Sequence, residues 1–313
     1  MQSKILLFGA SGKQGTCCLE SMLNHEKFSQ VEKVRLFCRH SNDRLESLIS
    51  RSRGKFELFT GNIADQSKVN EAMNGMQCCV LIQNPGEYNQ DFNEGSRLEL
   101  EYGKTVVDSA AQNNVSNFVL SSWASACSAK EVPHFQSKCK LETYLKEKES
   151  SFQNFNLVRP CWFMENLEWE EEFSNPIRNE QKLRLPLKAN TNLPMCSAHD
   201  AGRALTECAL DPSKLSHHNN IVEICGDVQK CEDMARMLNC QFEECRPQDL
   251  QNPAYQKMYE YLQTEPIRPD MEFCKTCIPN MKTFQQFCSQ SSLMEKSRPQ
   301  VGKEQAAAGV SRT

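Results

Sequence analysis

The sequence predicts an α/β protein, with a Rossmann-like doubly wound parallel sheet followed by a small C-terminal α+β cap. Over the first 160 residues, short apolar runs alternate with longer helical patterns. A glycine-rich loop directly follows the first run, and after residue 160 the alternation loosens and prolines become frequent. We therefore expect a nucleotide-binding core over residues 1–160, a cap over 161–288 that folds back on it, and a disordered tail over 289–313.

Six apolar runs are expected to form the strands of the sheet. Each is short, rich in Val, Leu, Ile, Phe or Cys, and lacks a clean alternation of polar and apolar residues. This pattern is typical of parallel strands that are covered on both faces. The runs span residues 4–8, 33–38, 56–60, 78–83, 117–122 and 155–160.

The segments between these strands are long enough for crossover helices, which we expect over 14–24, 66–75, 95–114 and 136–149. In the third, one apolar face recurs at helical spacing, and polar residues are expected on the other face. The apolar set is Leu98, Tyr102, Val106 and Ala110, and the polar set is Glu99, Thr105, Ser109 and Gln112. In the cap, residues 198–210, 234–238 and 254–262 are helix candidates and 221–225 is a short strand candidate.

The charge balance excludes some classes of partner. With 36 Lys and Arg against 40 Asp and Glu, the formal net charge is −4. A protein that binds nucleic acid or a membrane surface directly would show a basic excess, so neither partner is expected. No apolar run approaches the ~18 residues needed to cross a bilayer.

The seventeen cysteines form no compact disulfide framework. Because the N-terminus shows no secretory signal, we expect a protein of the cytoplasm or the nucleus whose thiols are mostly free. Cys274 and Cys277 form one C-x-x-C motif without a second pair or a nearby His, so no metal site is expected.

The strongest chemical motif is the glycine loop after the first strand. Gly9, Gly12 and Gly15 frame Ser11, Lys13 and Gln14 at the start of a predicted helix. Glycines allow a tight turn and let backbone N–H groups approach a pyrophosphate at the helix N-terminus. The strand–loop–helix context supports a dinucleotide site.

The end of the second predicted strand indicates which dinucleotide is preferred. NAD sites usually carry an Asp or Glu there, whereas this chain has Arg39. A guanidinium suits a phosphate dianion, because it donates bidentate, charge-assisted hydrogen bonds. We therefore expect NADP(H) to be preferred over NAD(H), with Arg44 as a second phosphate contact.

Several segments resemble the NmrA-like family of the atypical short-chain dehydrogenase/reductase superfamily. They are KILLFGASGKQG at the N-terminus, FTGNIAD at 59–65, PHFQSKCKLETY at 133–144, LVRPCWFMEN at 157–166 and RPDME at 268–272. The last is similar to the animal NADPH sensors of this family. The resemblance covers residues 4–288, and Asn62 departs from it where the family often has Asp.

The resemblance implies a role for each matching residue. Gly9, Gly12, Gln14 and Gly15 would hold the pyrophosphate, Arg39 the 2′-phosphate and Lys138 the nicotinamide ribose. Asn62 would lie near the adenine, Gln83 and Asn84 beneath the ribose, and Trp162 and Asn166 beside the nicotinamide. Six cysteines lie near these motifs: Cys17, Cys18, Cys38, Cys78, Cys79 and Cys161. Most cysteines are expected to be small apolar core residues, and oxidation of the few that line the cleft is expected to weaken NADPH binding.

The residues leave open whether the protein is an enzyme. In the parent superfamily, a Tyr four residues before the Lys protonates the product, but His134 occupies that place relative to Lys138. His134 and Tyr88 are candidate replacements. One hypothesis is a redox sensor or regulator whose homodimerisation or binding to a regulatory protein responds to NADPH. The alternative is an atypical NADPH-dependent reductase of a carbonyl, a quinone or an activated alkene.

Overall fold

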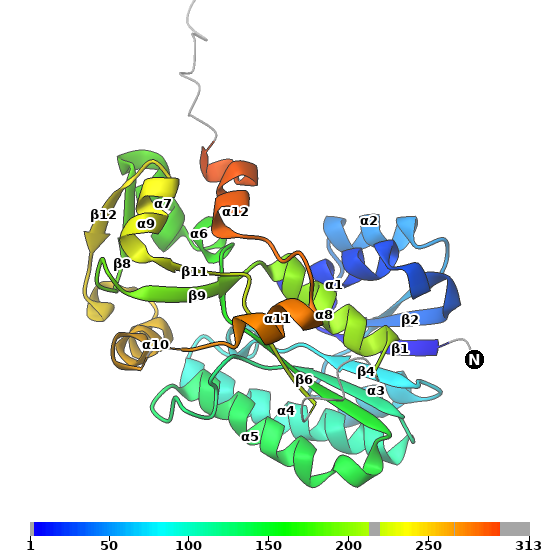
Figure 1. Ribbon diagram of the computed structural model, residues 1–313. Coiled ribbons are helices and arrows are strands. Elements are labelled where there is room, and N and C mark those ends of the chain that lie inside the picture. Colours follow the sequence, from blue (N-terminus) through cyan, green and yellow to red (C-terminus); the bar gives the residue numbers. More distant parts are fainter. Residues whose placement is uncertain (1–2, 213–219, 266, 295–313) are drawn as a thin grey trace, which may run out of the picture.

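The main body of the protein is a seven-stranded parallel sheet (Figure 1). Its strand order is β10-β6-β5-β4-β1-β2-β3. The computed structural model describes residues 3–212, 220–265 and 267–294. The strands are β1 (Ser3–Phe8), β2 (Val31–Cys38), β3 (Phe56–Thr60), β4 (Cys78–Leu81), β5 (Asn117–Ser121), β6 (Asn154–Pro160) and β10 (Ile221–Ile224). The six strands predicted before residue 160 are confirmed, and the seventh comes from the predicted cap.

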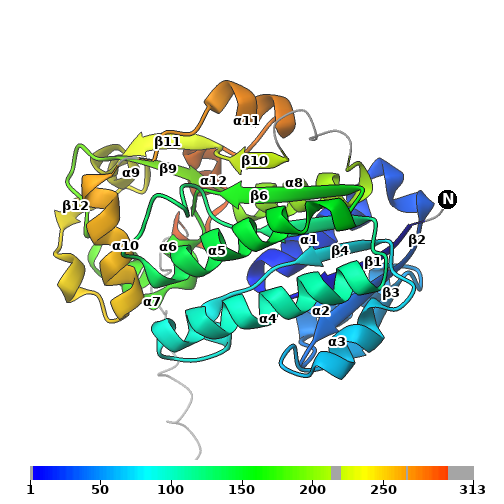
Figure 2. The same ribbon diagram turned by 90° about the horizontal axis from the view of Figure 1, so that it is seen from below.

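Helices cover both faces of this sheet, as Figures 1 and 2 show. One face carries α1 (Lys13–Asn24), α2 (Asp43–Arg51) and α8 (Ala198–Leu210), and the other carries α3 (Gln66–Met73), α4 (Phe92–Gln112) and α5 (Pro133–Glu147). Strand β1 shows why its sequence lacks alternation. Ile5 and Leu7 pack in the core on the first face, whereas Leu6 and Phe8 pack in the core on the second.

Two elements from the second half of the chain complete the core. Strand β10 pairs with β6, with Val222 opposite Val158. Helix α8 packs along α1 so closely that a Cβ on Gly202 would lie 2.6 Å from the carbonyl carbon of Cys17. The core therefore extends beyond residue 160, because β6 has a free edge that only a later strand can cover.

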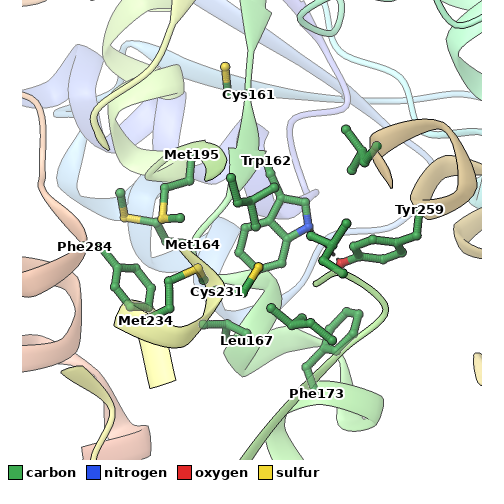
Figure 3. Packing of buried hydrophobic residues seen from close by; sticks show 14 of the residues in the cluster. Cys161, Trp162, Met164, Leu167, Phe173, Met195, Cys231, Met234, Tyr259 and Phe284 are labelled. Carbon is green, nitrogen blue, oxygen red and sulfur yellow. Dashed lines mark hydrogen bonds between the residues drawn. The ribbon is translucent and has the colours of Figure 1, made fainter. Parts of the chain in front are cut away.

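The cap consists of small sheets and short helices. Its strands are β7 (Trp162–Phe163), β8 (Lys182–Leu185), β9 (Asn192–Cys196), β11 (Asp227–Lys230) and β12 (Gln241–Glu244), in the sheets β11-β9-β7 and β12-β8. Its helices are α6 (Asn166–Trp169), α7 (Glu171–Glu180), α9 (Cys231–Met237), α10 (Pro253–Thr264), α11 (Met271–Cys277) and α12 (Phe284–Gln290). They share one apolar cluster, in which Trp162, Phe173 and Tyr259 are fully buried (Figure 3).

The chain also forms short 3-10 helices: η1 (Glu26–Gln30), η2 (Pro85–Glu87), η3 (Glu149–Ser151), η5 (Pro247–Asp249) and η6 (Ser292–Met294). Because α12 ends at Gln290 and η6 follows, residues 289–294 of the predicted tail are structured. The rest of that tail, 295–313, lies outside the described residues.

The contact between α1 and α8 yields a stability prediction. Gly→Ala in a helix normally stabilises by about 1 kcal/mol. We expect Gly202→Ala to destabilise the protein by about 1–3 kcal/mol instead, because the new methyl group would meet the α1 backbone at Cys17 and Cys18. Denaturant unfolding measures the change, with Ser47→Ala on the exposed side of α2 as the control. Unchanged or increased stability of Gly202→Ala would contradict the packing.

Candidate functional site

A cleft of about 860 Å³ lies at the carboxyl ends of the core strands, where the cap meets them. It is lined by the segments that follow β1 to β6, by the start of α5, and by cap residues including Trp169, Phe173 and Tyr255. The chain leaves β1 and β4, neighbours in the sheet, toward opposite faces. Open α/β sheets bind ligands at such a switch point.

The glycine loop forms the floor of this cleft. Gly9 has φ +77°, and a Cβ there would lie 2.4 Å from the carbonyl oxygen of Ile82. A Cβ on Gly15 would lie 2.1 Å from the carbonyl oxygen of Gly9, so neither position accepts a side chain. Gly12 precedes α1 without a side-chain cap, and the first turn holds no acidic residue. The N-terminus of α1 therefore suits an anion in the cleft.

The other loop residues are held by their neighbours. Ser121 Oγ donates to Gln14 Oε1 at 3.0 Å. Asn42 Nδ2 donates to the carbonyl oxygen of Ser11 at 3.0 Å. Lys13 reaches the cap, where its Nζ lies 3.6 Å from Glu170 Oε1 and 4.7 Å from the ring centroid of Trp169. The side chain of Lys13 thus joins the core to the cap across the cleft.

Arg39 and Arg44, the two arginines predicted to contact the 2′-phosphate, lie in different places. Arg39 lines the rim of the cleft, half-exposed, and its Nη2 donates to Glu87 Oε2 at 2.7 Å. Arg44 is not among the residues that line the cleft. Its Nη2 lies 3.2 Å from Glu20 Oε1 on α1, because α2 begins at Asp43 and presents Arg44 to α1.

The other predicted nucleotide contacts also line the cleft: Asn62, Gln83, Asn84, Trp162 and Asn166. Asn62 Oδ1 accepts a hydrogen bond from the backbone N–H of Ala64, and Asn84 Oδ1 accepts one from Gly86, so both side chains stabilise local turns. Trp162 Nε1 donates to Tyr259 Oη at 3.2 Å, so this side chain belongs mainly to the core of the cap.

Lys138 is paired with the buried carboxylate of Glu99 on α4. Its Nζ donates to Glu99 Oε1 at 2.9 Å and to the carbonyl oxygen of Gln83 at 3.2 Å. Ser137 Oγ donates to the other oxygen of Glu99, whose side chain is 1% exposed. The prediction that Glu99 lies on the polar outer face of α4 is wrong, because α5 packs there and supplies both partners. Ser109, also predicted on that face, is buried as well.

Neither His134 nor Tyr88, the two candidate proton donors, has a pKa that suits acid catalysis near neutral pH. His134 packs edge-to-face against Phe92 and Phe135. Burial, with the charge of Lys138 as the second cause, lowers the pKa of His134 to about 3. Tyr88 Oη accepts a hydrogen bond from Gln83 Nε2 at 3.0 Å, and burial raises the pKa of Tyr88 well above its usual range.

Unpartnered polar atoms gather around the cleft. Within the described residues, eleven buried side-chain nitrogen or oxygen atoms lack a hydrogen-bond partner, and six belong to residues that line the cleft. These six atoms are Gln14 Nε2, Ser41 Oγ, Gln83 Oε1, Ser122 Oγ, Trp123 Nε1 and His134 Nδ1. Since buried polar groups are normally paired, this set and the open helix N-terminus fit a polar ligand with an anionic group.

The described part of the chain offers no group of three or more His, Cys, Asp or Glu residues that could hold a metal ion. None of its helices is both long and apolar enough to cross a membrane.

Solved structures share this fold at low sequence identity. The NADPH-dependent quinone oxidoreductase QOR2 of Escherichia coli, complexed with NADPH, has a TM-score of 0.73 at 15% identity, covering 91% of this chain and 99% of that chain. Citrobacter sp. triphenylmethane reductase, complexed with NADP(H), has a TM-score of 0.73 at 12% identity, covering 92% and 99%. NmrA, a negative transcriptional regulator, has a TM-score of 0.71 at 14% identity, covering 95% and 97%.

At such low sequence identity, the TM-scores show that these proteins share the fold of this chain. No curated protein sequence matches the chain. The NmrA-like family does match, over residues 1–245, which includes the core sheet, the glycine loop and most of the cap. The match contains the four resembling segments up to residue 166 and confirms the family resemblance, whereas the segment 268–272 lies beyond it. The chain belongs to the NmrA-like family.

Proposed function

We propose that this protein is an NADP(H)-binding regulator whose association with a second copy or with a regulatory protein depends on nucleotide occupancy. The observation that carries the proposal is a cleft with a phosphate-binding geometry in which neither candidate proton donor has a pKa near neutral pH. The glycine loop, the N-terminus of α1 and Arg39 line the same cleft as His134 and Tyr88.

The residues of the cleft suit a dinucleotide phosphate. Gly9, Gly12 and Gly15 would let a pyrophosphate approach the first N–H groups of α1. Arg39, at the end of β2, would hold the 2′-phosphate of the adenine ribose, and no carboxylate of β2 takes its place. Arg39 must first leave Glu87, an exposed pair that stabilises by only about 0–1 kcal/mol.

The protonation states of His134 and Tyr88 support a regulator over an enzyme. When bound, NADPH supplies a hydride, and reduction of a carbonyl also requires a proton donor. The neutral ring of His134 has no readily released proton, and burial holds the proton on Tyr88. Lys138 cannot lower the pKa of a nearby tyrosine as a free cation would, because Glu99 compensates its charge.

Regulation requires that the nucleotide bind one conformation better than another. Lys13 offers a physical basis for this difference, since it follows Gly12 in the phosphate loop and contacts Trp169 and Glu170 of the cap. A phosphate beside the loop would compete for the ammonium of Lys13. The nucleotide would thereby alter the contact between core and cap, and with it the surface offered to a partner.

A reductase is the second candidate. It is favoured by the position of Lys138 in the cleft and by two proteins with the same fold, the NADPH-dependent quinone oxidoreductase QOR2 and triphenylmethane reductase. Its substrate would be a carbonyl, a quinone or an activated alkene.

One experiment separates the two candidates. The purified protein is titrated with NADPH and NADH while mass in solution and nicotinamide absorbance are recorded with a panel of carbonyls, quinones and alkenes. A regulator binds NADPH, changes its sedimentation and turns over no substrate. Multiple turnovers that Lys138→Ala abolishes would instead establish the reductase.

Arg39→Asp tests the 2′-phosphate contact. A lost charge-assisted contact of about 1.5–3 kcal/mol predicts a rise of about 10- to 100-fold in the Kd for NADPH and a much smaller change for NADH. Arg236→Asp on α9, also an exposed arginine paired with carboxylates, is the control and should leave both constants unchanged. Equal NADPH affinity of Arg39→Asp and the parent protein would refute the assignment.

His134 gives a prediction for pH dependence. Its ring stays neutral in the folded protein down to about pH 3, whereas the unfolded chain takes up a proton below about pH 6.5. Acidification from pH 7.5 to 5 therefore costs about 2 kcal/mol of folding stability that His134→Gln would not lose. Urea unfolding at both pH values measures this difference, with His40→Gln, an exposed histidine of the same cleft, as the control. Parallel losses in His134→Gln and the parent protein would count against a buried neutral ring.

A further inference from the structure

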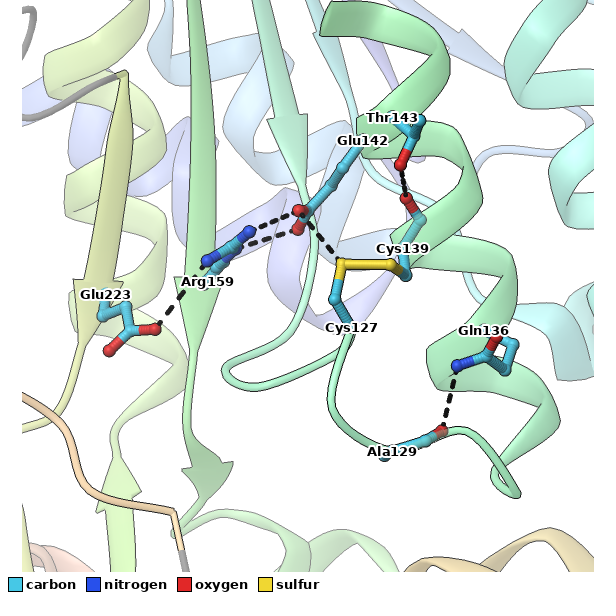
Figure 4. Close-up of a disulfide and its surroundings, with 8 residues drawn as sticks. All are labelled: Cys127, Ala129, Gln136, Cys139, Glu142, Thr143, Arg159 and Glu223. Carbon is cyan, nitrogen blue, oxygen red and sulfur yellow. Dashed lines mark hydrogen bonds and ion pairs between the residues drawn. A yellow bond between two sulfur atoms is a disulfide. The ribbon is translucent and has the colours of Figure 1, made fainter.

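A disulfide braces the wall of the cleft. It joins Cys127, in the β5–α5 loop (residues 122–132), to Cys139 on α5, with 4.9 Å between their Cα atoms (Figure 4). The loop begins with Ser122 and Trp123, which line the cleft, and Cys139 directly follows Lys138. Trp123 stacks on Phe135 of α5 with ring centroids 5.0 Å apart. The disulfide thus ties together the two segments that supply this wall.

The other described cysteines are poorly placed for thiol chemistry. All of these except Cys240 and Cys245 are buried. Burial raises the pKa of Cys17 to about 11 and that of Cys18 to about 12, so these thiols stay protonated and unreactive. Cys127 is exposed, and Cys139 is half-buried. The disulfide is therefore the site that a dissolved thiol reaches first.

The surroundings of the disulfide favour attack on Cys127. Glu142 Oε2 lies 4.0 Å from the sulfur of Cys127, and this carboxylate is itself buried and paired with Arg159 (Figure 4). Attack on Cys139 would release a Cys127 thiolate beside that negative charge, which disfavours it. Attack on the exposed Cys127 releases the thiolate of Cys139 instead.

We propose that Cys127–Cys139 is a reversible thiol–disulfide exchange site, and that its reduction loosens the β5–α5 loop and thereby the cleft wall. The thiolate of a dithiol or of glutathione attacks Sγ of Cys127, the S–S bond breaks, and Cys139 leaves as a thiolate that takes a proton. A second reductant thiolate then attacks the mixed disulfide and releases Cys127. Two electrons pass from the two reductant thiols, which become a disulfide, to the two cysteines.

The β5–α5 loop has a buried inner side and an exposed outer side, so its outer side can gain freedom without unfolding of the core. Ala126, Ala129 and Val132 are buried in the cap cluster and hold the inner side of the loop. Its outer residues Cys127, Ser128, Lys130 and Glu131 are exposed. Gln136 Nε2 donates to the carbonyl oxygen of Ala129 at 3.1 Å, one link to α5 that remains after reduction. Reduction therefore removes the covalent restraint on the outer side and leaves the apolar anchors in place.

Tryptic cleavage after the exposed Lys130 tests the proposal on the full-length protein without any nucleotide. The protein is incubated with millimolar reduced glutathione and alkylated, and its peptides are analysed by mass spectrometry. Cys127 and Cys139 should be the first cysteines whose alkylation increases on reduction. Cleavage after Lys130 should then accelerate by about fivefold or more, because local opening is easier. Cleavage after Lys188, an exposed lysine of the cap, is the internal reference and should stay constant.

Variants show whether the disulfide itself is responsible. Cys127→Ser/Cys139→Ser should cleave at the fast rate with or without glutathione, whereas the matched control Cys240→Ser/Cys245→Ser should respond like the parent protein. Resistance of the native disulfide to glutathione, or equal cleavage rates in both redox states, would overturn the proposal.

The effect on the nucleotide rests on the proposed function, and it is measured separately. Reduction should change the Kd for NADPH in the parent protein and not in Cys127→Ser/Cys139→Ser. If NADPH fails to bind in either redox state while cleavage after Lys130 still responds to glutathione, the proposed function fails and the exchange site stands. If NADPH binds but cleavage does not respond, the exchange site fails alone.

Discussion

The close contact of α1 with the loop after β1 is the constraint on which the cleft depends. Gly15 approaches the backbone of Gly9 on one side, and Gly202 of α8 approaches the backbone at Cys17 on the other. Helix α1 is therefore fixed between the glycine loop and a helix that comes late in the chain. This fixes where its N-terminus opens into the cleft. Because α8 and β10 belong to the core, the chain enters the cap after β6, returns to the core for α8 and β10, and then enters the cap again. Core and cap are therefore connected at several points around the cleft.

The pair of Lys138 and Glu99 has a comparable role on the opposite face of the sheet. Burying a carboxylate costs several kcal/mol unless a cation and hydrogen-bond donors compensate it. Glu99 receives both from a single turn of α5, through Ser137 and Lys138. The ammonium of Lys138 is thus part of the packing between α4 and α5 as well as part of the cleft. Because this packing role accounts for Lys138 without any reaction, the presence of Lys138 alone does not decide between the regulator and the reductase.

Much of the fold was predictable because it depends on local signals. Apolar runs covered on both faces located six strands, and the glycines located the loop at α1. Contacts between residues that are far apart in the sequence were not predictable. Helical periodicity placed Glu99 on the polar face of α4, since the sequence does not show that α5 packs there. Proximity along the chain suggested Arg44 as a phosphate contact, although α2 turns it toward Glu20. Cys127 and Cys139 are separated by a loop whose path no spacing rule describes, so their disulfide could not be anticipated.

The cysteines acquire different physical roles once their positions are known. Among the cysteines near the predicted nucleotide motifs, Cys38 lines the cleft, whereas Cys17 and Cys161 do not. Burial raises the pKa of the Cys17 and Cys38 thiols, and the hydrogen bond with Cys225, followed by burial, raises that of Cys161. Each thiol therefore behaves as a small apolar side chain. The exposed disulfide differs because it lies beside the buried pair of Glu142 and Arg159, whose residues belong to the segments 133–144 and 157–166 that carry the family resemblance. Opening the disulfide leaves that ion pair intact, so α5 and β6 stay joined while the loop between β5 and α5 gains freedom. Redox chemistry at this position can therefore alter the wall of the cleft without disturbing the glycine loop on its floor.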